Sequence, residues 1–406
     1  MSSNRLNVME ALPISNPIVH TIILKVVAPC NLNCTYCYEY NRGDETWKIK
    51  PKTIQLDTAR KVAARIAEHV GRHKLTHFNL NLHGGEPMML GAKGLERTIT
   101  AIKEAVPGVR LRLGMQTNAT LTSDPIIEVL RRHQVSVGAS LDGNQFANRF
   151  RIDHQGRESW KRATTGIRKL SESGQLAGIQ SVINLDSDPG ETLDTLYGLG
   201  ARQIELGQPF GNHANPPILS PKRTLGEWLA QAFDYWIHHN TLKHVRIPVL
   251  EDALLNILSG RSTSDWFPSA PQGYIVVATD GAYESLDTLK VVGREGREFQ
   301  LDVDTASIDQ VAQHPFIVAR SENKLCDTCQ ACAIKDWCHG GYYPTRYANE
   351  NGFNNPSLYC SDWKFLFQHL AQELLNYEKV DAARRAQIEQ RLQALKETLA
   401  NTETFT

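Results

Sequence analysis

The sequence predicts an α/β fold in which a partial barrel of parallel strands precedes a smaller, cysteine-rich module. Strand-like apolar runs alternate with amphipathic helical segments from Val19 to about Pro209. All eight cysteines fall either between residues 30 and 37 or between residues 326 and 360. Alternating strands and helices favour parallel strands joined by crossover helices. Six such units make a partial (β/α)6 barrel, three quarters of a TIM barrel, with functional groups at the carboxyl ends of its strands.

The six expected strands are short apolar runs followed by polar residues. They cover residues 21–27, 78–83, 109–116, 136–141, 178–184 and 203–207. Between the first two, apolar residues recur at every fourth position and predict a helix that ends at Gly71, a residue suited to the left-handed conformation. A later helix is expected to begin with Asp124 as its cap and Pro125 in its first turn.

The pattern changes after Pro216-Pro217. Helices are expected at 225–239 and 249–258, a strand-turn-strand around Asp280-Gly281, and one charged helix from about Asp362 to the high 390s. We therefore expect five parts: an N-terminal extension (1–18), the barrel (19–217), a helical bridge (218–270), an auxiliary module (271–365) and a C-terminal helix (366–406).

Composition excludes several classes of partner. The chain has 406 residues, of which 41% are hydrophobic, and its 44 basic and 44 acidic residues cancel. With no net field and no Lys/Arg block, we expect neither a nucleic-acid partner nor a membrane partner. The first residues lack a secretion signal, and no run of 18 apolar residues occurs, so we expect a cytoplasmic protein.

The cysteines indicate metal or cluster sites rather than disulfides. Close-spaced cysteines in a large chain without a secretion signal are typical of metal ligands. Cys30, Cys34 and Cys37 follow the first strand and leave one coordination position open, as a 4Fe-4S cluster on three cysteines does. S-adenosylmethionine (SAM) would fit that position through its amino and carboxylate groups. A structural zinc site prefers four protein ligands, and a zinc loop is the alternative.

Polar residues follow the next strands at the same edge of the sheet. The second strand runs into His83-Gly84-Gly85-Glu86-Pro87, where paired glycines let the backbone approach a ligand and Glu86 supplies an anion for the methionyl ammonium. Later strands end at Asn118, Ser140 and Asn184, which suit hydrogen bonds to ribose and carboxylate groups.

Cys-x3-Cys-x2-Cys after the first strand and Gly-Gly-Glu-Pro after the second resemble the radical SAM superfamily. The resemblance implies reductive cleavage of SAM to methionine and a 5'-deoxyadenosyl radical, which abstracts hydrogen from an unactivated carbon. It also implies that Tyr36 lies near adenine, that Gly84 to Glu86 bind the methionyl amine, and that Ser140 and Arg151 contact the ribose or carboxylate.

The second group of cysteines resembles the second auxiliary cluster of SPASM domains. Four cysteines, with spacing x2, x5 and x21, would hold one auxiliary 4Fe-4S cluster, and zinc is the alternative. They are Cys329, Cys332, Cys338 and Cys360. A full SPASM domain carries two auxiliary clusters, and this chain has too few cysteines for both. Tyr342 stands where the pattern expects a further cysteine, and Cys326 is left over.

Three stretches resemble one subfamily, the FxsB, GrrM and XyeB type of peptide maturase: residues 38–47, residues 279–290, and residues 338–346 with 352–356. The resemblance implies a ribosomally made precursor peptide as substrate and a three-residue cyclophane as product. In that reaction a β-hydrogen is abstracted and the β-carbon is joined to an aromatic ring. A reducing partner such as flavodoxin or ferredoxin is also implied.

Other activities remain open. Sulfatase-type formylglycine maturation and thioether formation are alternatives, although the missing first auxiliary cluster counts against both. A non-catalytic iron-sulfur or zinc protein that binds a peptide is the alternative outside the enzymes. The acids Asp142, Glu205, Asp280 and Glu284 fall near strand or turn ends, and none is assigned as the catalytic base.

Overall fold

The computed structural model describes residues 18–262, 264–292, 298–377 and 380–403. It confirms the six parallel strands, within about two residues of the expected bounds. They are β1 (Thr21–Val27), β2 (Phe78–Gly84), β3 (Leu111–Thr117), β4 (Ser136–Ser140), β5 (Leu176–Val182) and β6 (Ile204–Gly207). Each pairs in parallel with its neighbour in chain order, so the carboxyl ends of all six meet at one rim.

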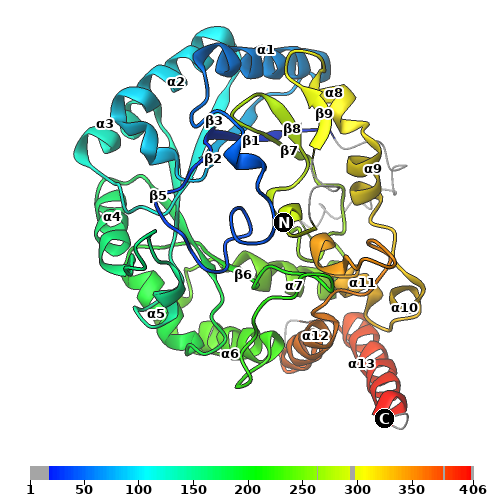
Figure 1. Cartoon of the computed structure of the whole chain (residues 1–406). Coiled ribbons are helices and arrows are strands. Elements are labelled where there is room, and N and C mark those ends of the chain that lie inside the picture. The colour runs from blue at the N-terminus through cyan, green and yellow to red at the C-terminus, as the bar shows by residue number, and fades with distance from the viewer. Residues whose placement is uncertain (1–17, 263, 293–297, 378–379, 404–406) are drawn as a thin grey trace, which may run out of the picture.

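Five helices cover the outside of this curved sheet (Figure 1). They are α1 (Leu56–His73), α2 (Gly91–Ala105), α3 (Asp124–His133), α4 (Trp160–Glu172) and α5 (Pro189–Gly198). Strand side chains alternate between two environments, as the period of two requires. In β2, Phe78, Leu80 and Leu82 are fully buried, whereas Asn81 and His83 line an inner cavity. The inner face is therefore polar and hollow, and the apolar core lies between the sheet and the helices.

The sheet continues past the barrel. Strands β7 (Tyr274–Val277), β8 (Ala282–Glu284) and β9 (Glu298–Asp302) extend it, and the described strands follow the order β6-β5-β4-β3-β2-β1-β7-β8-β9. Strand β7 pairs in parallel with β1, and β8 turns back antiparallel at Asp280-Gly281 as expected. Strand β1 thus lies inside the sheet, between β2 and β7.

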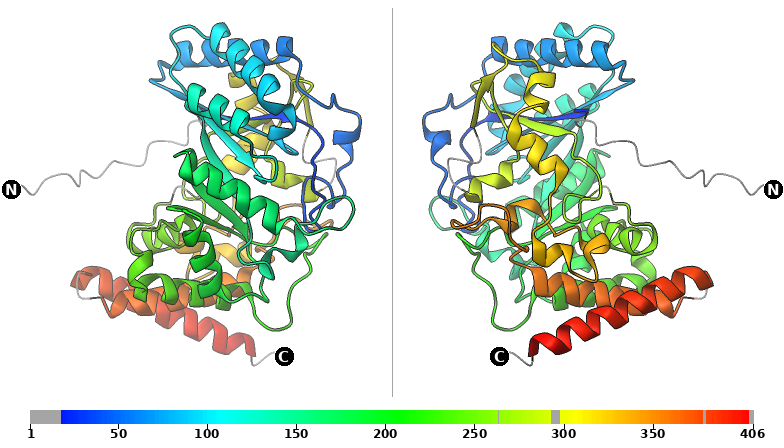
Figure 2. Two further views of the ribbon diagram at one scale, coloured as in Figure 1. Left: turned by 90° about the vertical axis from the view of Figure 1, so that its left-hand side faces the viewer. Right: turned by 90° about the vertical axis from the view of Figure 1, so that its right-hand side faces the viewer.

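The remaining helices close the open side of the barrel. They are α6 (Leu225–His238), α7 (Pro248–Ser259), α8 (Ile308–Ala312), α9 (Pro315–Glu322), α10 (Asp327–Gln330), α11 (Lys335–Cys338), α12 (Cys360–Leu375) and α13 (Ala382–Glu403). Helix α12 packs against α6 and α7, and α13 packs on α12 at one end of the molecule (Figure 2). Among the described helices, none has the length and apolarity needed to cross a membrane.

Three sequence expectations about helices were wrong in detail. Helix α1 continues past Gly71 to His73, and Lys74 adopts the left-handed conformation at its end, with φ of 51°. Asp124 is the first helical residue of α3, so Ser123, and not Asp124, occupies the N-cap position. The single C-terminal helix is two helices, α12 and α13, and α12 begins at Cys360.

Candidate functional site

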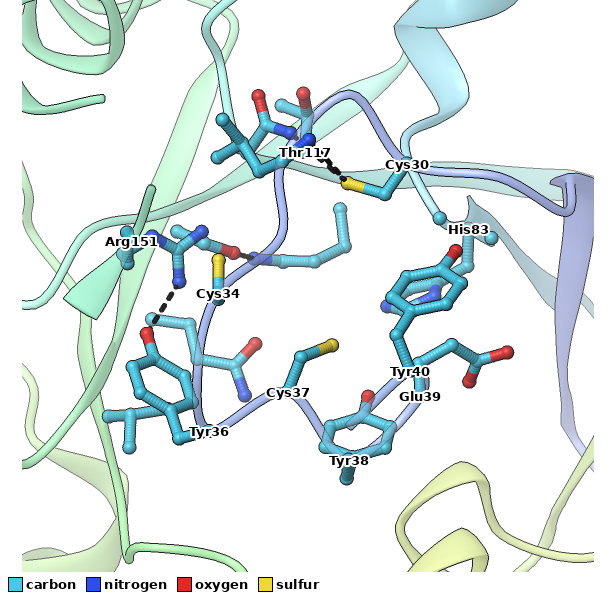
Figure 3. Close-up of a pocket in the computed structure, with 18 of the residues that line it drawn as sticks. Cys30, Cys34, Tyr36, Cys37, Tyr38, Glu39, Tyr40, His83, Thr117 and Arg151 are labelled. Atoms are coloured by element: carbon cyan, nitrogen blue, oxygen red, sulfur yellow. Dashed lines mark hydrogen bonds between the residues drawn. The ribbon is translucent and has the colours of Figure 1, made fainter. Parts of the chain in front are cut away.

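The loop after β1 brings Cys30, Cys34 and Cys37 together at the barrel rim. Their sulfurs point into one space beside a cavity of about 140 Å³ (Figure 3). The Asn118 side-chain amide lies 3.7 Å from the Cys30 sulfur and donates toward it. Burial raises the pKa of Cys34, and it raises the pKa of Cys37 to about 12. Such thiols become ligands when iron displaces their protons, so the donor set fits a three-cysteine 4Fe-4S cluster.

Gly84 and Gly85 allow this loop to cross the end of β2. A β-carbon on Gly84 would lie 2.1 Å from the carbonyl oxygen of Val27, and one on Gly85 would lie 2.0 Å from that of Pro29. Gly84 also has a φ of 136°, which side chains rarely adopt. The glycine pair is therefore required by close backbone contact with the cysteine loop, and both glycines line the cavity.

Tyr36, Asp142 and Arg151 form a buried hydrogen-bonded group on one wall of the cavity. The Tyr36 hydroxyl donates to the Asp142 carboxylate, and Arg151 Nη1 donates to the Tyr36 oxygen at 3.0 Å (Figure 3). The Asp142 carboxylate also accepts the Val182 amide at 3.1 Å. Arg151 Nε is buried without a hydrogen-bond partner among the described residues. An unpaired guanidinium nitrogen beside the cysteines is suited to a carboxylate ligand.

The other expected SAM contacts divide into two groups. Asn118 and Ser140 line the cavity, and the Ser140 hydroxyl accepts from the Gln116 amide at 2.8 Å. Asn184 lines a neighbouring cavity of about 320 Å³, which shares Tyr36 with the first. The Asn184 amide donates to the Ala147 carbonyl at 3.0 Å, which fixes the loop after β5.

Glu86 lies behind the cavity wall. Its carboxylate is fully buried and accepts three hydrogen bonds, from the amides of Met88 and Asn118 and from the Thr117 hydroxyl, at 2.9, 2.7 and 2.7 Å. These donors tie the end of β2 to the end of β3. Glu86 is not among the residues that line the cavity, so in this structure it braces the rim that carries Gly84 and Gly85.

A chamber of about 640 Å³, lined by both polar and apolar side chains, lies inside the barrel next to the cysteine loop. Tyr38, His83, Gln116 and Gln180 line both the chamber and the first cavity, so the two adjoin. Asp287, from the 3-10 helix 287–292, points into the chamber. Its Oδ2 lies 3.8 Å from His83 Nδ1.

Asp287 is the functional candidate that the sequence left unmarked. Among the described residues, Asp287 Oδ1 and His83 Nδ1 are both buried without a hydrogen-bond partner. Buried polar atoms are nearly always paired, so an unpaired acid and imidazole facing a chamber mark a place for a ligand. Residues 279–290 carry the subfamily resemblance, but only the tertiary fold places Asp287 at the chamber.

Three of the four acids considered as the catalytic base form hydrogen bonds or ion pairs with other side chains. Asp142 is held by Tyr36 and Arg151, and Asp280 forms an exposed ion pair with Lys50. Glu284 pairs with Lys25 at 3.1 Å, and the lysines around it hold its pKa at about 2 against the opposing effect of burial.

Glu205 on β6 is different, because burial and the neighbouring Asp252 and Asp265 raise its pKa to about 7. When Glu205 ionises, its buried charge lowers the stability of the folded protein. This loss begins above the ordinary pKa of a glutamate, is complete above pH 7 and reaches about 3 kcal/mol. We expect Glu205→Gln to be more stable than the parent at pH 8 and to lose that advantage at pH 5. Urea unfolding at the two pH values measures this, with exposed Glu104→Gln as the control. An advantage independent of pH would contradict it.

A buried ion network fixes the cysteine loop to the auxiliary module. Glu39, two residues after Cys37, accepts from Lys25 on β1 at 3.0 Å and from Lys290. Lys290 also lies 3.1 Å from Asp44. Side chains of all four are less than a tenth exposed. Residues 38–47 and 279–290, two of the stretches behind the subfamily resemblance, thus meet in one network.

The second group of cysteines also converges. Cys329, Cys332, Cys338 and Cys360 line a cavity of about 230 Å³ between α10, α11 and the start of α12. Burial raises the pKa of Cys329 to about 12. The four donors fit a closed four-cysteine site, as the spacing predicts.

Arg346 supplies a positive charge beneath this site. Its guanidinium is buried and donates to the carbonyls of His339, Gly340 and Gly341 at 2.7 to 2.9 Å. Gly340 and Gly341 have φ of 78° and 72°, and a β-carbon on either would lie within 3 Å of Arg346 or Trp363. The Gly-Gly turn after Cys338 therefore lets the chain wrap around this cation.

Cys326 lies outside the cavity lining, although its thiol contacts that of Cys329. We expect anaerobically reconstituted Cys326→Ser to keep its iron and Cys332→Ser to lose about one 4Fe-4S cluster per chain. Iron and sulfide analysis measures both variants. Equal losses in the two would make Cys326 a ligand, and bound zinc without sulfide would contradict the cluster assignment.

An apolar cluster surrounds Tyr342, the position at which the sequence pattern leads us to expect a further cysteine. Tyr342 and Leu286 lie together with Leu289, and Phe210 packs against them. The Tyr342 hydroxyl hydrogen-bonds that of Thr288 at 2.5 Å. These side chains fill the space beside Asp287 with packed rings and leave no thiol there among the described residues.

Comparison with known proteins relates the barrel residues to a known superfamily. Residues 25–199 match the model of the radical SAM superfamily. The serine-type anaerobic sulfatase-maturating enzyme of Klebsiella aerogenes is 26% identical over 336 residues, which cover 80% of this chain and 80% of that protein. These findings confirm the radical SAM resemblance and the expected fold class, and this relative is a sulfatase-maturating enzyme rather than a cyclophane-forming maturase.

Two solved structures share the fold across most of the chain. Native anSMEcpe with bound AdoMet superposes with a TM-score of 0.75 at 19% identity, over 88% of this chain and 98% of that one. Streptococcus suis SuiB bound to precursor peptide SuiA gives 0.62 at 14% identity, over 86% and 76%. At these identities the likeness concerns the fold alone.

Proposed function

We propose that this protein, whose residues 25–199 form a radical SAM domain, oxidises a side chain of a peptide by abstracting hydrogen from its β-carbon. One observation carries the proposal: the three-cysteine loop adjoins a chamber of about 640 Å³ into which an unpaired acid, Asp287, points. The anaerobic sulfatase-maturating relative and SuiB, solved with its precursor peptide, support a peptide as substrate.

Two groups complete the site in this proposal. Cys30, Cys34 and Cys37 would hold a 4Fe-4S cluster, with Gly84 and Gly85 at the methionyl amine of SAM. Arg151 Nε, which has no hydrogen-bond partner among the described residues, would take the methionyl carboxylate, and Tyr36 would lie near adenine. The cluster and SAM together supply the radical that abstracts hydrogen.

A residue that lines the chamber would accept the proton that the substrate loses. After hydrogen abstraction the substrate must lose one electron and one proton to become a closed-shell product. Asp287 would accept that proton, since it lines the chamber, and His83, whose Nδ1 lies 3.8 Å from Asp287 Oδ2, would orient it. Cys329, Cys332, Cys338 and Cys360 would hold the auxiliary 4Fe-4S cluster, which supplies the electron acceptor.

We favour oxidation of a peptidyl serine to an aldehyde, or of a peptidyl cysteine to a thioaldehyde that water hydrolyses to the aldehyde with release of hydrogen sulfide. We favour this sulfatase-type reaction because the sulfatase-maturating relative covers 80% of the chain. The second candidate is the cyclophane crosslink to an aromatic ring. Residues 38–47 and 279–290, which carry that resemblance, are joined by the Glu39–Lys290 ion pair, and the second cysteine group is one site rather than two.

A flavodoxin or ferredoxin would deliver the electron, and the cytoplasm is the proposed compartment.

The test uses anaerobically reconstituted enzyme with SAM and dithionite. Formation of 5'-deoxyadenosine, lost in Cys34→Ala, is the expected first result. Candidate peptides, a sulfatase-derived serine peptide and any small peptide encoded beside the gene, are then followed by mass spectrometry. An aldehyde that reacts with a hydrazide supports the sulfatase-type reaction. A peptide lighter by two hydrogens, inert to hydrazide and resistant to fragmentation between the joined residues, supports the crosslink. Absence of SAM cleavage by fully loaded enzyme would refute the proposal.

A further inference from the structure

A third cluster of ligand-type side chains, without cysteine, lies on the outside of the barrel. His69 and His73 are one turn apart on α1, and Asp309 comes from α8, which packs beside α1 (Figure 1). His69 Nδ1 lies 2.8 Å and His73 Nε2 lies 2.7 Å from Asp309 Oδ1. The ligand atoms of the three residues all lie within 4.8 Å of one another.

A neutral His69 cannot donate a hydrogen bond to both of its neighbours. His69 Nε2 lies 2.8 Å from the carbonyl oxygen of Val19, which can only accept. A neutral imidazole has one N–H, so donating it to Val19 leaves a lone pair on Nδ1. That lone pair faces a carboxylate oxygen at 2.8 Å, so the contact is repulsive unless His69 carries a second proton or a metal ion binds both groups.

We propose that His69, His73 and Asp309 bind a divalent first-row transition metal, with zinc as the best match. Two imidazole nitrogens and one carboxylate are a common three-ligand zinc set, completed by water. A ligating histidine usually donates its other nitrogen to a backbone carbonyl, as His69 does to Val19. The second carboxylate oxygen of Asp309 lies 3.2 Å from Arg72 Nη1, which orients it.

The exposure of the three side chains suits entry of an ion from one side. His69 is 2% exposed, Asp309 17% and His73 28%, so the site is closed toward the core and open toward solvent. The metal would join α1, the segment before β1 and α8, three elements from distant parts of the chain. This role is structural and does not depend on the proposed reaction.

The test uses holoenzyme with both cysteine sites loaded with iron and sulfide, so that those thiols are occupied. After removal of loose metal, the protein is incubated with zinc and desalted, and bound zinc is measured together with its X-ray absorption spectrum. The expected result is one zinc per chain, with only nitrogen and oxygen neighbours at about 2.0–2.1 Å. His73→Ala and Asp309→Asn should lose it. His133→Ala, which removes a histidine paired with a single acid, Glu96, should keep it.

Three outcomes would overturn the proposal: no retained zinc, sulfur neighbours in the spectrum, or equal binding by His73→Ala. A melting-temperature increase on adding zinc, seen in the parent and in His133→Ala but absent from both ligand variants, gives a second readout. That comparison holds even if one ligand variant is less stable, because each protein is compared with itself.

Discussion

Asp287→Asn is expected to cleave SAM at the parental rate and to form modified peptide about 10²–10⁴-fold more slowly, the usual contribution of a general base. The substitution keeps the size of the side chain and removes its ability to accept a full proton. Because Asp287 lines the inner chamber and not the cavity beside the cysteines, SAM binding should be unaffected. The ratio of 5'-deoxyadenosine to modified peptide, measured in single turnovers, gives the effect directly.

The matched control for Asp287 is Asp280→Asn, an exposed acid on the turn before β8. It should leave both products unchanged. If 5'-deoxyadenosine and modified peptide fell together in Asp287→Asn, the residue would support the fold or SAM binding instead. If neither fell, another group must take the proton, and Glu205, with a pKa of about 7, would be the next to replace.

Lys290→Met is expected to lower the free energy of unfolding by about 3–5 kcal/mol, because it leaves Glu39 buried with one cation fewer. The Lys290 side chain is 3% exposed, so water cannot replace the lost charge. Part of the loss should return in Lys290→Met with Glu39→Gln, where the carboxylate is also removed. Anaerobic urea unfolding measures both proteins.

Lys48→Met provides the comparison for Lys290. Lys48 pairs with Glu45 at the surface, where the side chains are 51% and 74% exposed, and surface pairs contribute about 1 kcal/mol or less. Equal effects at Lys290 and Lys48 would show that burial of the network contributes little. Since Glu39 is in the cysteine loop, loss of Lys290 should also slow cluster reconstitution.

The sequence predicts the scaffold well because its signals are local. Period-two strands, amphipathic helices and the Cys-x3-Cys-x2-Cys spacing each lie within a few residues, and all six barrel strands form where expected. Gly71 shows the limit of such signals. It is a good helix terminator, yet α1 continues to His73, whose ring bonds Asp309 on α8. A tertiary contact decided where the helix ends.

The sequence did not predict the roles of residues whose contacts come from distant parts of the chain. Glu86 belongs to a recognised motif, but two of its three hydrogen-bond donors, Thr117 and Asn118, come from the end of the next strand. Asp287 Oδ1 has no hydrogen-bond partner among the described residues, a feature that no local sequence pattern encodes. Lys290 likewise reads as an ordinary charged residue until Glu39 and Asp44 are found beside it.

The position of β1 between β2 and β7 has a consequence for biosynthesis. Thr21 pairs with both Asn79 and Tyr274, so β1 has one edge that stays unpaired until about 250 further residues are made. Contacts of such sequence separation slow folding and expose unpaired strands to aggregation. The nascent chain should therefore remain dependent on chaperones until β7 emerges, and truncation before residue 274 should give insoluble protein rather than an independent barrel.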